Sequence, residues 1–234
     1  MPVLGGTFMH FHVPKPLHGW RELAGEVGII VLGVLIALGA EQLIETLQWD
    51  RRRADAETAM TKELGEDDGA QAEARIALSH CLAAQLDLVQ RSLIAERDGS
   101  GPFVSPVIAA PPFRTWDDNA WRAAVASNAT SHMSTARTSD WSTAYAFIPD
   151  MNEAALRESS DWADLYGVRQ LRPHPSESEL DAMLAAVSRA RHDNDLLTTV
   201  SEYFLIWTHR AGVLVPDASV RHELKEQREE MRNC

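Results

Sequence analysis

Cysteine is scarce in this chain, whose 234 residues include only Cys81 and Cys234. Two cysteines cannot build a disulfide framework. We expect Cys81 on a helix and Cys234 at the end of a polar tail, and a single long-range bridge between them is the alternative. Cysteine content therefore does not identify the compartment.

Positive charge is also scarce. The chain has 22 Lys and Arg against 34 Asp and Glu, which gives a net charge of -12. A surface this acidic repels phosphate backbones, so we expect no nucleic-acid partner. Hydrophobic residues make up 45% and charged residues 24% of the chain, which is close to ordinary globular composition and argues against wholesale disorder.

Sequence motifs for catalysis or cofactor binding are missing. The chain has no glycine-rich phosphate loop, no Cys-x-x-Cys pair and no His-Glu-x-x-His motif. His80–Cys81 and the His-Asp-Asn-Asp cluster at 192–195 are the closest groupings of reactive side chains, but adjacent helix positions diverge, so we expect 192–195 to form a solvated helix face. His10 and His12 have no converging ligands nearby. We expect no enzyme activity, no cofactor and no metal site.

What the chain does contain is one long apolar run. Residues 27–40 carry no polar side chain, and this run alone would extend about 21 Å as a helix. Its apolar flanks lengthen it toward the roughly 30 Å of a hydrocarbon core. Trp20 and Trp49 would lie about 43 Å apart along one helix, at the interfaces that tryptophan favours. We therefore predict a transmembrane helix over residues 20–49 with these two tryptophans as interface anchors.

Three other interpretations of this run stay open. It could be a cleaved secretory signal, with Lys15 and Arg21 as the charged region and residues 37–39 as the cleavage site. It could also be a buried helix of a soluble core, or an interfacial helix. The apolar residues surround the helix rather than form a stripe, which favours lipid over the last two.

Small residues recur on one side of the predicted span. Gly33, Ala37 and Ala40 follow i, i+4, i+7 spacing, and Glu26 lies seven residues before Gly33 on the same face. Small side chains let helix backbones approach closely, so we predict that this face packs against a transmembrane helix of another copy or of another membrane protein. Glu26 is costly inside hydrocarbon, and we expect it at headgroup depth or against that partner.

Beyond the span, apolar residues recur every three or four positions, and no stretch alternates long enough for a strand. We expect the anchor helix to end near Gly65, with Asp67 or Asp68 capping the next helix. Residues 99–113 contain four prolines and predict a loop. The sequence predicts an all-α fold in which one N-terminal transmembrane helix continues into a helical bundle.

Further capping signals divide the second half of the chain. Asp117, Asp118 or Asn119 is expected to cap a short helix, and Ser176 with Glu179 predicts a capping box. The predicted organisation has a juxtamembrane arm at 1–19, the transmembrane helix at 20–49 and a helical soluble domain at 50–216. A charged C-terminal tail follows at 217–234, either as a solvated helix or as a frayed end.

Two stretches resemble a widespread family of uncharacterised bacterial single-pass membrane proteins. Residues 25–38 read Gly-Glu-Val-Gly-Ile-Ile-Val-Leu-Gly-Val-Leu-Ile-Ala-Leu, which is similar to that family's N-terminal span. Residues 121–129, followed by an aromatic-bearing helix at Trp141 and Tyr145, resemble its second recurring stretch. There a short helix ends in a Ser-Gly-like turn, whereas Asn128 stands here where Gly is common, and residues 39–42 also depart from the family pattern.

The resemblance implies a location as well as a fold. Such proteins look like periplasm-facing helical domains on a single span in the bacterial inner membrane, with no known activity. We therefore expect a non-enzymatic scaffold or accessory subunit of a membrane complex, with lipid and transmembrane helices as its partners. The alternative is a ligand-sensing domain in which the 99–113 loop closes a cleft lined by Trp116, Trp121 and Trp141.

Overall fold

The structure is a computed structural model that describes residues 19–104, 106–167 and 174–231. The chain divides after Trp49 into two compact units. Among the described residues all regular structure is helical, with no strand. The prediction of an all-α fold with a helical bundle is confirmed, while the predicted juxtamembrane arm lies outside the described residues except for Gly19.

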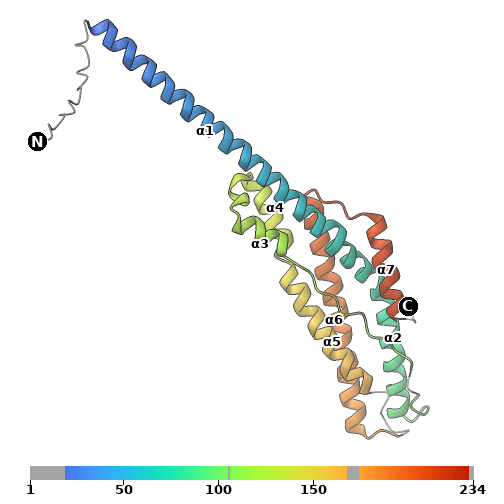
Figure 1. Ribbon diagram of the computed structural model, residues 1–234. Coiled ribbons are helices and arrows are strands. Elements are labelled where there is room, and N and C mark those ends of the chain that lie inside the picture. The colour runs from blue at the N-terminus through green and yellow to red at the C-terminus, as the bar shows by residue number, and fades with distance from the viewer. Residues whose placement is uncertain (1–18, 105, 168–173, 232–234) are drawn as a thin grey trace, which may run out of the picture. The chain divides into compact units, whose positions relative to one another are not determined.

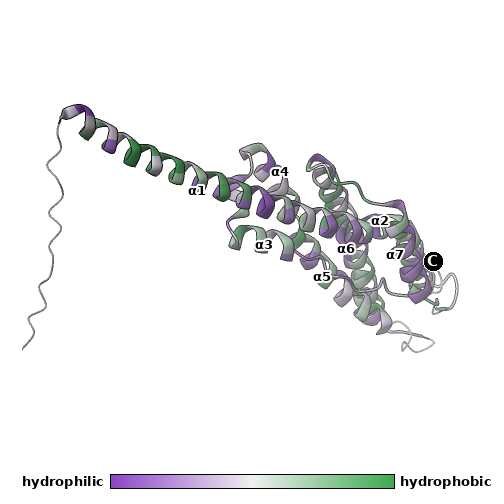
Figure 2. Ribbon diagram, turned by 45° about the horizontal axis from the view of Figure 1, so that its top comes forward, coloured by the Kyte–Doolittle hydropathy of each residue, from purple (hydrophilic) through white to green (hydrophobic). Residues whose placement is uncertain are grey.

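The apolar run lies in helix α1 (Trp20–Lys62). This helix is long and apolar enough to cross a membrane, a criterion of length and composition that a signal sequence or a core helix would also meet. The side chains of the apolar stretch are exposed, from Leu23 to Leu47. Hydrophobic colour covers this part of α1 along several successive turns (Figure 2).

Helix α1 ends at Lys62, close to the predicted position, but the helical chain does not break there as the sequence predicts. It passes through a π-helical turn, η1 (Glu63–Asp67), directly into α2 (Asp68–Arg97). The backbone N–H of Asp68 donates to the carbonyl oxygen of Glu63, five residues back. Asp67 has helical dihedral angles and its side chain makes no capping hydrogen bond, so the prediction that an aspartate caps a separate helix here is also wrong.

The two glycines of this turn serve close packing rather than helix termination. A Cβ at Gly65 would lie 3.0 Å from the carbonyl oxygen of Leu214, and one at Gly69 would lie 2.4 Å from the carbonyl oxygen of Leu64 and 2.6 Å from Cγ2 of Val215. The missing side chains therefore allow the segment after α6 to approach the turn, and they allow the π-helical backbone itself.

Replacing Gly69 with alanine is expected to lower the free energy of unfolding by about 1–3 kcal/mol, because the added methyl group meets backbone and cannot be relieved by a rotamer change. Alanine in a helix without this contact would raise it by up to about 1 kcal/mol. Urea unfolding followed by circular dichroism measures the difference. The matched control is Gly101→Ala, where the nearest atom is 4.0 Å from the added Cβ; a stabilised Gly69→Ala variant would refute the close packing.

The long helices of the bundle are α2, α5 (Ile148–Tyr166) and α6 (Glu177–Arg210). Helix α6 packs against α2, α5 and α4 (Thr135–Tyr145), and the last helix, α7 (Asp217–Met231), packs against α2 (Figure 1). The short helices α3 (Asn119–Ala126) and η2 (Ala129–His132) precede α4. The capping box of α6 is confirmed, since the Glu179 N–H donates to Ser176 Oγ at 3.3 Å and the Ser176 N–H to Glu179 Oε2 at 2.7 Å.

The described part of the C-terminal segment is a helix, one of the two expected states, but one side of it is buried. Residues 217–231 fold as α7, and Gln227 and Met231 are buried. Met231 belongs to a core cluster with Leu78, Leu82 and Val187. The high charge of this segment hid a narrow buried face, because a helix needs only a few apolar or uncharged positions to dock on a neighbour.

Asn128, which stands where the resembled family commonly has glycine, is the one described non-glycine residue with a positive φ, at 61°. Left-handed backbone is favoured by glycine and tolerated by asparagine, which explains both residue types at this turn. Asn128→Gly is expected to change the free energy of unfolding by less than about 1 kcal/mol, whereas Asn128→Val should lower it by roughly 1–2 kcal/mol. Thermal unfolding of both variants tests this. Equal losses of stability in Asn128→Gly and Asn128→Val would contradict a left-handed backbone at this residue.

Candidate functional site

The residues of the predicted packing face all lie in α1 with exposed side chains. They are Glu26, Gly33, Ala37 and Ala40. A Cβ at Gly33 would meet nothing within 4 Å, so the face is open to a close approach. Trp20 is 79% exposed, and the indole N–H of Trp49 lies 3.4 Å from Glu45 Oε1. Packing of this face and interface anchoring stay predictions.

A buried ion pair joins three helices of the bundle. Arg75 of α2 and Glu158 of α5 are bonded through Nη2 and Oε1, and both side chains are almost completely buried. The same Nη2 donates to Oδ1 of Asn194 in α6 at 3.1 Å. Burial raises the pKa of Glu158, while the Arg75 guanidinium lowers it. The pair therefore ties α2, α5 and α6 together through charge taken out of water.

The prediction that residues 192–195 form a solvated face is wrong for two of them. Asp193 is 4% exposed and Asn194 2%. Asp193 lies 3.7 Å from Nε of Arg157, and burial raises its pKa. The spacing along the helix could have predicted the burial of Asn194. This residue is three positions before Leu197 and seven after Val187, on the apolar stripe of α6. Arg75 likewise follows Ala72 and precedes Leu82 on the stripe of α2.

A second polar cluster surrounds Glu63 at the π-helical turn. Both of its carboxylate oxygens accept from the N–H of Ala120, at 3.1 and 3.0 Å, and the Tyr145 hydroxyl donates to Oε1 at 2.9 Å. Burial raises the pKa of Glu63. Asp118 is the residue before α3, but its side chain makes no capping bond. A carboxylate from 57 residues upstream thus caps α3 in place of the predicted aspartates.

Asp68 is the second acid of this cluster with a raised pKa. It is 2% exposed, its Oδ1 accepts from the Asp117 N–H at 3.2 Å, and its Oδ2 has no partner among the described residues. Burial raises its pKa to about 8, helped by the neighbouring charges of Glu63 and Asp117. Asp68 is therefore largely protonated at neutral pH.

The proline-containing loop runs back along the bundle from α2 to α3 (Figure 1). We call residues 106–118 the strap. Side chains of the helices fasten its backbone: Gln85 accepts from the Ala109 N–H at 2.7 Å, and the Tyr166 hydroxyl from the Ala110 N–H at 3.0 Å. Asn152 pairs with both backbone groups of Trp116, at 3.0 and 2.8 Å. The strap is thus held at separate points along the helices.

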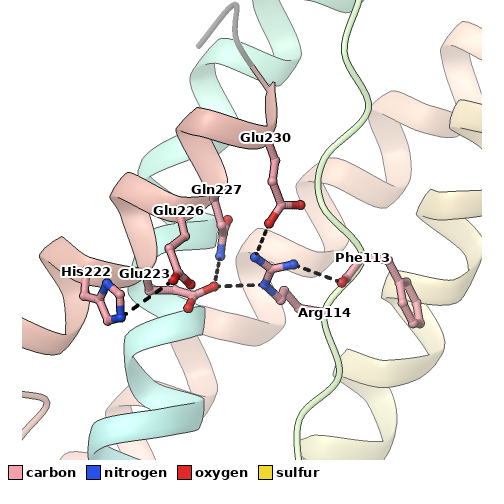
Figure 3. A network of polar contacts seen from close by, with 7 residues as sticks. All are labelled: Phe113, Arg114, His222, Glu223, Glu226, Gln227 and Glu230. Carbon is pink, nitrogen blue, oxygen red and sulfur yellow. Dashed lines mark hydrogen bonds and ion pairs between the residues drawn. The ribbon is translucent and has the colours of Figure 1, made fainter.

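Arg114 connects the strap to α7 (Figure 3). Its Nε donates to Glu223 Oε1 at 3.0 Å and its Nη2 to Glu230 Oε1 at 2.8 Å. Gln227, between these two glutamates on the same helix face, donates to Glu223 at 2.9 Å. The charged residues of the C-terminal segment therefore act as acceptors for one strap arginine, a role that their sequence pattern alone did not reveal.

Beneath the strap lies a cavity of about 10 Å³, which has room for about one water molecule. Gln71, Arg75 and Trp116 line it, and Pro111 and Pro112 belong to its apolar wall. The alternative interpretation of the sequence, a ligand-sensing domain, would place three tryptophans around a cleft under this loop. Only Trp116 is there, because Trp141 is fully buried in the core and Trp121 stacks on Tyr145 at 5.8 Å.

Cys81 is disulfide-bonded, and the one other cysteine of the chain, Cys234, lies outside the described residues. The alternative of a bridge between Cys81 and Cys234 therefore falls on a residue outside the described ranges. Sequence alone could not predict a disulfide at Cys81, because two cysteines this far apart in the chain carry no spacing signature.

Within the described ranges, no group of three or more His, Cys, Asp or Glu side chains is placed to hold a metal ion; His10 and His12 lie outside those ranges. Comparison of the chain with protein-family models, curated proteins and solved structures finds no match. The resemblance of residues 25–38 and 121–129 to a bacterial membrane family stays a prediction, and the functional argument rests on geometry.

Proposed function

We propose that this protein is a membrane-anchored scaffold or accessory subunit without catalytic activity, held in the bacterial inner membrane by residues 20–49. The exposed apolar stretch of α1 carries the proposal. Leaving this many apolar side chains in water would be costly, at roughly 25 cal/mol for each Å². A lipid environment removes that cost, and Trp20 and Trp49 would then lie at the two interfaces.

The association surface would be the face of Glu26, Gly33, Ala37 and Ala40. Gly33 leaves the backbone open to a second helix, and close backbone contact is the main source of attraction between helices in lipid. The partner is a transmembrane helix, either from a second copy or from another membrane protein. The buried polar bonds of the bundle would then keep the soluble domain in one shape while the span provides the contact.

Gly33→Leu is expected to weaken this association at least about tenfold, because the side chain separates the backbones at the crossing point. The matched control is Gly39→Leu, which adds the same side chain about 120° around the helix from Gly33, outside the proposed face. Crosslinking of the full chain in native membranes, followed by co-purification in mild detergent, measures the effect. Lone monomers for the unmodified chain, or equal losses for both variants, would overturn the proposed surface.

The disulfide at Cys81 supports a periplasmic location for the helical domain. Disulfides persist in the periplasm and are rare in the bacterial cytoplasm. Alkylation of the full chain in intact cells before and after reduction tests this: we expect labelling of Cys81 and Cys234 only after reduction. Labelling of both thiols without reductant, together with protection of the domain from externally added protease in spheroplasts, would place the domain inside instead.

A ligand-sensing domain is the second candidate, and the cavity under the strap favours it. The strap crosses between helices that are far apart in sequence, and its Arg114 is tied to α7. A ligand in the cavity would shift the strap, and the Arg114 ion pairs would pass that shift on to α7. A domain whose unfolding temperature and strap protection are unchanged by any small polar solute would remove this candidate.

A further inference from the structure

Three side chains that line the cavity under the strap carry polar atoms without a partner among the described residues. They are Oε1 of Gln71, Nε and Nη1 of Arg75, and Nε1 of Trp116. Arg75 is 5% exposed and Trp116 3%, so neither group can reach bulk water. Buried polar atoms normally have a hydrogen-bond partner, and three orphaned groups at one small cavity indicate that something else occupies it.

The charges around the cavity decide the kind of occupant. Arg75 is already paired with Glu158, and Arg114 with Glu223 and Glu230. Two guanidinium groups thus face three carboxylates, and a bound anion would add to the excess of negative charge. The unpartnered atoms are donors on Arg75 and Trp116 and an acceptor on Gln71. A neutral group that both accepts and donates matches them.

We propose that this cavity is the closed form of a binding site for a small neutral ligand with a primary carboxamide group. The carbonyl oxygen accepts from Arg75 and from the Trp116 indole, and the amide nitrogen donates to Gln71. A short apolar tail lies against Pro111, Pro112 and Leu197, which are part of the wall. One water molecule offers the same two functions and fills the site when the ligand is absent.

Entry requires the strap to move, because the closed cavity has room for only about one water molecule. The strap is suited to such a movement. Its described hydrogen bonds to the helices run through side chains of Asp68, Gln85, Asn152 and Tyr166. Arg114 adds two ion pairs at the surface (Figure 3). Segments fastened in this way open locally at a lower cost than helices in the core.

The test uses three probes of nearly equal shape on the full chain in lipid nanodiscs. Propionamide supplies both the acceptor and the donor, butanone replaces the amide nitrogen by a methyl group, and propionate is the charged counterpart. The readout is the indole N–H signal of Trp116 in nitrogen-15 NMR, assigned with Trp116→Phe. With few atoms, propionamide is expected to bind with a dissociation constant on the order of 1 mM.

We expect butanone to bind about tenfold more weakly than propionamide, because it leaves the Gln71 acceptor unpaired. Propionate should produce no saturable shift. In Gln71→Leu the advantage of propionamide over butanone should disappear, while Gln90→Leu, a glutamine change elsewhere on α2, should preserve it. Gln71 is only half-buried, so its variant is suited to the comparison even if changes at Arg75 unfold the domain.

Two results would overturn the proposal. If propionamide leaves the Trp116 signal unmoved up to about 100 mM, the cavity holds structural water and no ligand. If propionate binds as tightly as propionamide, the site recognises anions and the charge argument fails. Neither result bears on the membrane anchor, because the cavity is formed by residues after 49, whereas the anchor is tested by crosslinking of α1.

Discussion

Arg75→Met is expected to lower the free energy of unfolding of the helical domain by about 3–5 kcal/mol, because it leaves the Glu158 carboxylate buried without its counter-charge. Both side chains are within a few per cent of full burial, so water cannot replace the guanidinium. Asn194 also loses its donor. Urea unfolding of the full chain in detergent, followed by circular dichroism, gives the change in free energy.

The double variant Arg75→Met, Glu158→Leu shows how much of this loss comes from the missing attraction between the two side chains and how much from a buried carboxylate left without a counter-charge. Removing both partners should recover most of the stability, since apolar side chains of similar size can replace a buried ion pair at little cost. Arg189→Met is the surface control: its side chain is 52% exposed beside Asp161 and Asp164, and we expect a much smaller loss than for Arg75→Met. Similar losses for Arg75→Met and Arg189→Met would contradict the burial argument.

Asp68→Asn is expected to stabilise the domain at pH 8 and to remove much of its dependence on pH. The pKa of Asp68 is raised by burial to about 8, whereas an unfolded aspartate titrates near pH 3.9. Below about pH 4 both states hold the proton and the stability is fully present. Between about pH 4 and 8 the unfolded chain releases it first, so stability falls by up to about 5 kcal/mol.

The measurement is the free energy of unfolding at several pH values between 5 and 8, on the native chain and on two variants. Glu63, Glu158 and Asp193 have pKa values raised in the same direction, so some loss of stability with rising pH should remain in Asp68→Asn. Asp67→Asn is the control, since Asp67 is exposed at the neighbouring position. Equal pH profiles for the native chain and Asp68→Asn would show that Asp68 titrates normally.

Periodicity predicted the helices well because each helix has a local cause. Ser176 and Glu179 are three residues apart, and their capping box forms without reference to the rest of the chain. The apolar residues Leu78, Leu82, Leu86, Val89 and Leu93 of α2 repeat every three or four residues and are buried as that spacing predicts. The region of the apolar run was likewise readable as a helix from composition alone.

The polar clusters could not be predicted in the same way, because their partners are far apart in sequence. Arg75 and Glu158 are 83 residues apart, and either could have been an ordinary surface charge. Their positions on apolar stripes were the one local signal, and a stripe does not identify which residue on another helix it faces. The same holds for Glu63 and α3, where a nearby aspartate was the obvious cap and a distant glutamate took its place.

Glycines misled the prediction at 65–69 for a related reason. A Gly after a cluster of acids is common at helix ends, and nothing local distinguishes that use from contact with Leu214 and Val215, which lie about 150 residues away in the chain. The signal becomes visible only when the fold brings the α6–α7 segment against the turn. Glycine serves both uses: its missing side chain permits the close approach of another segment, and its conformational freedom permits a helix to end.

The π-helical turn has a consequence for the phase of the helix that runs through it. A turn closed by a five-residue step contains one residue more than a regular α-helical turn. Deleting a single residue from 63–67 would leave an unbroken helix but rotate residues 50–62 by about 100° relative to α2. Met60 would then swing out of the core in which it is now completely buried. The extra residue therefore sets which side of α1 points inward as the chain enters the bundle.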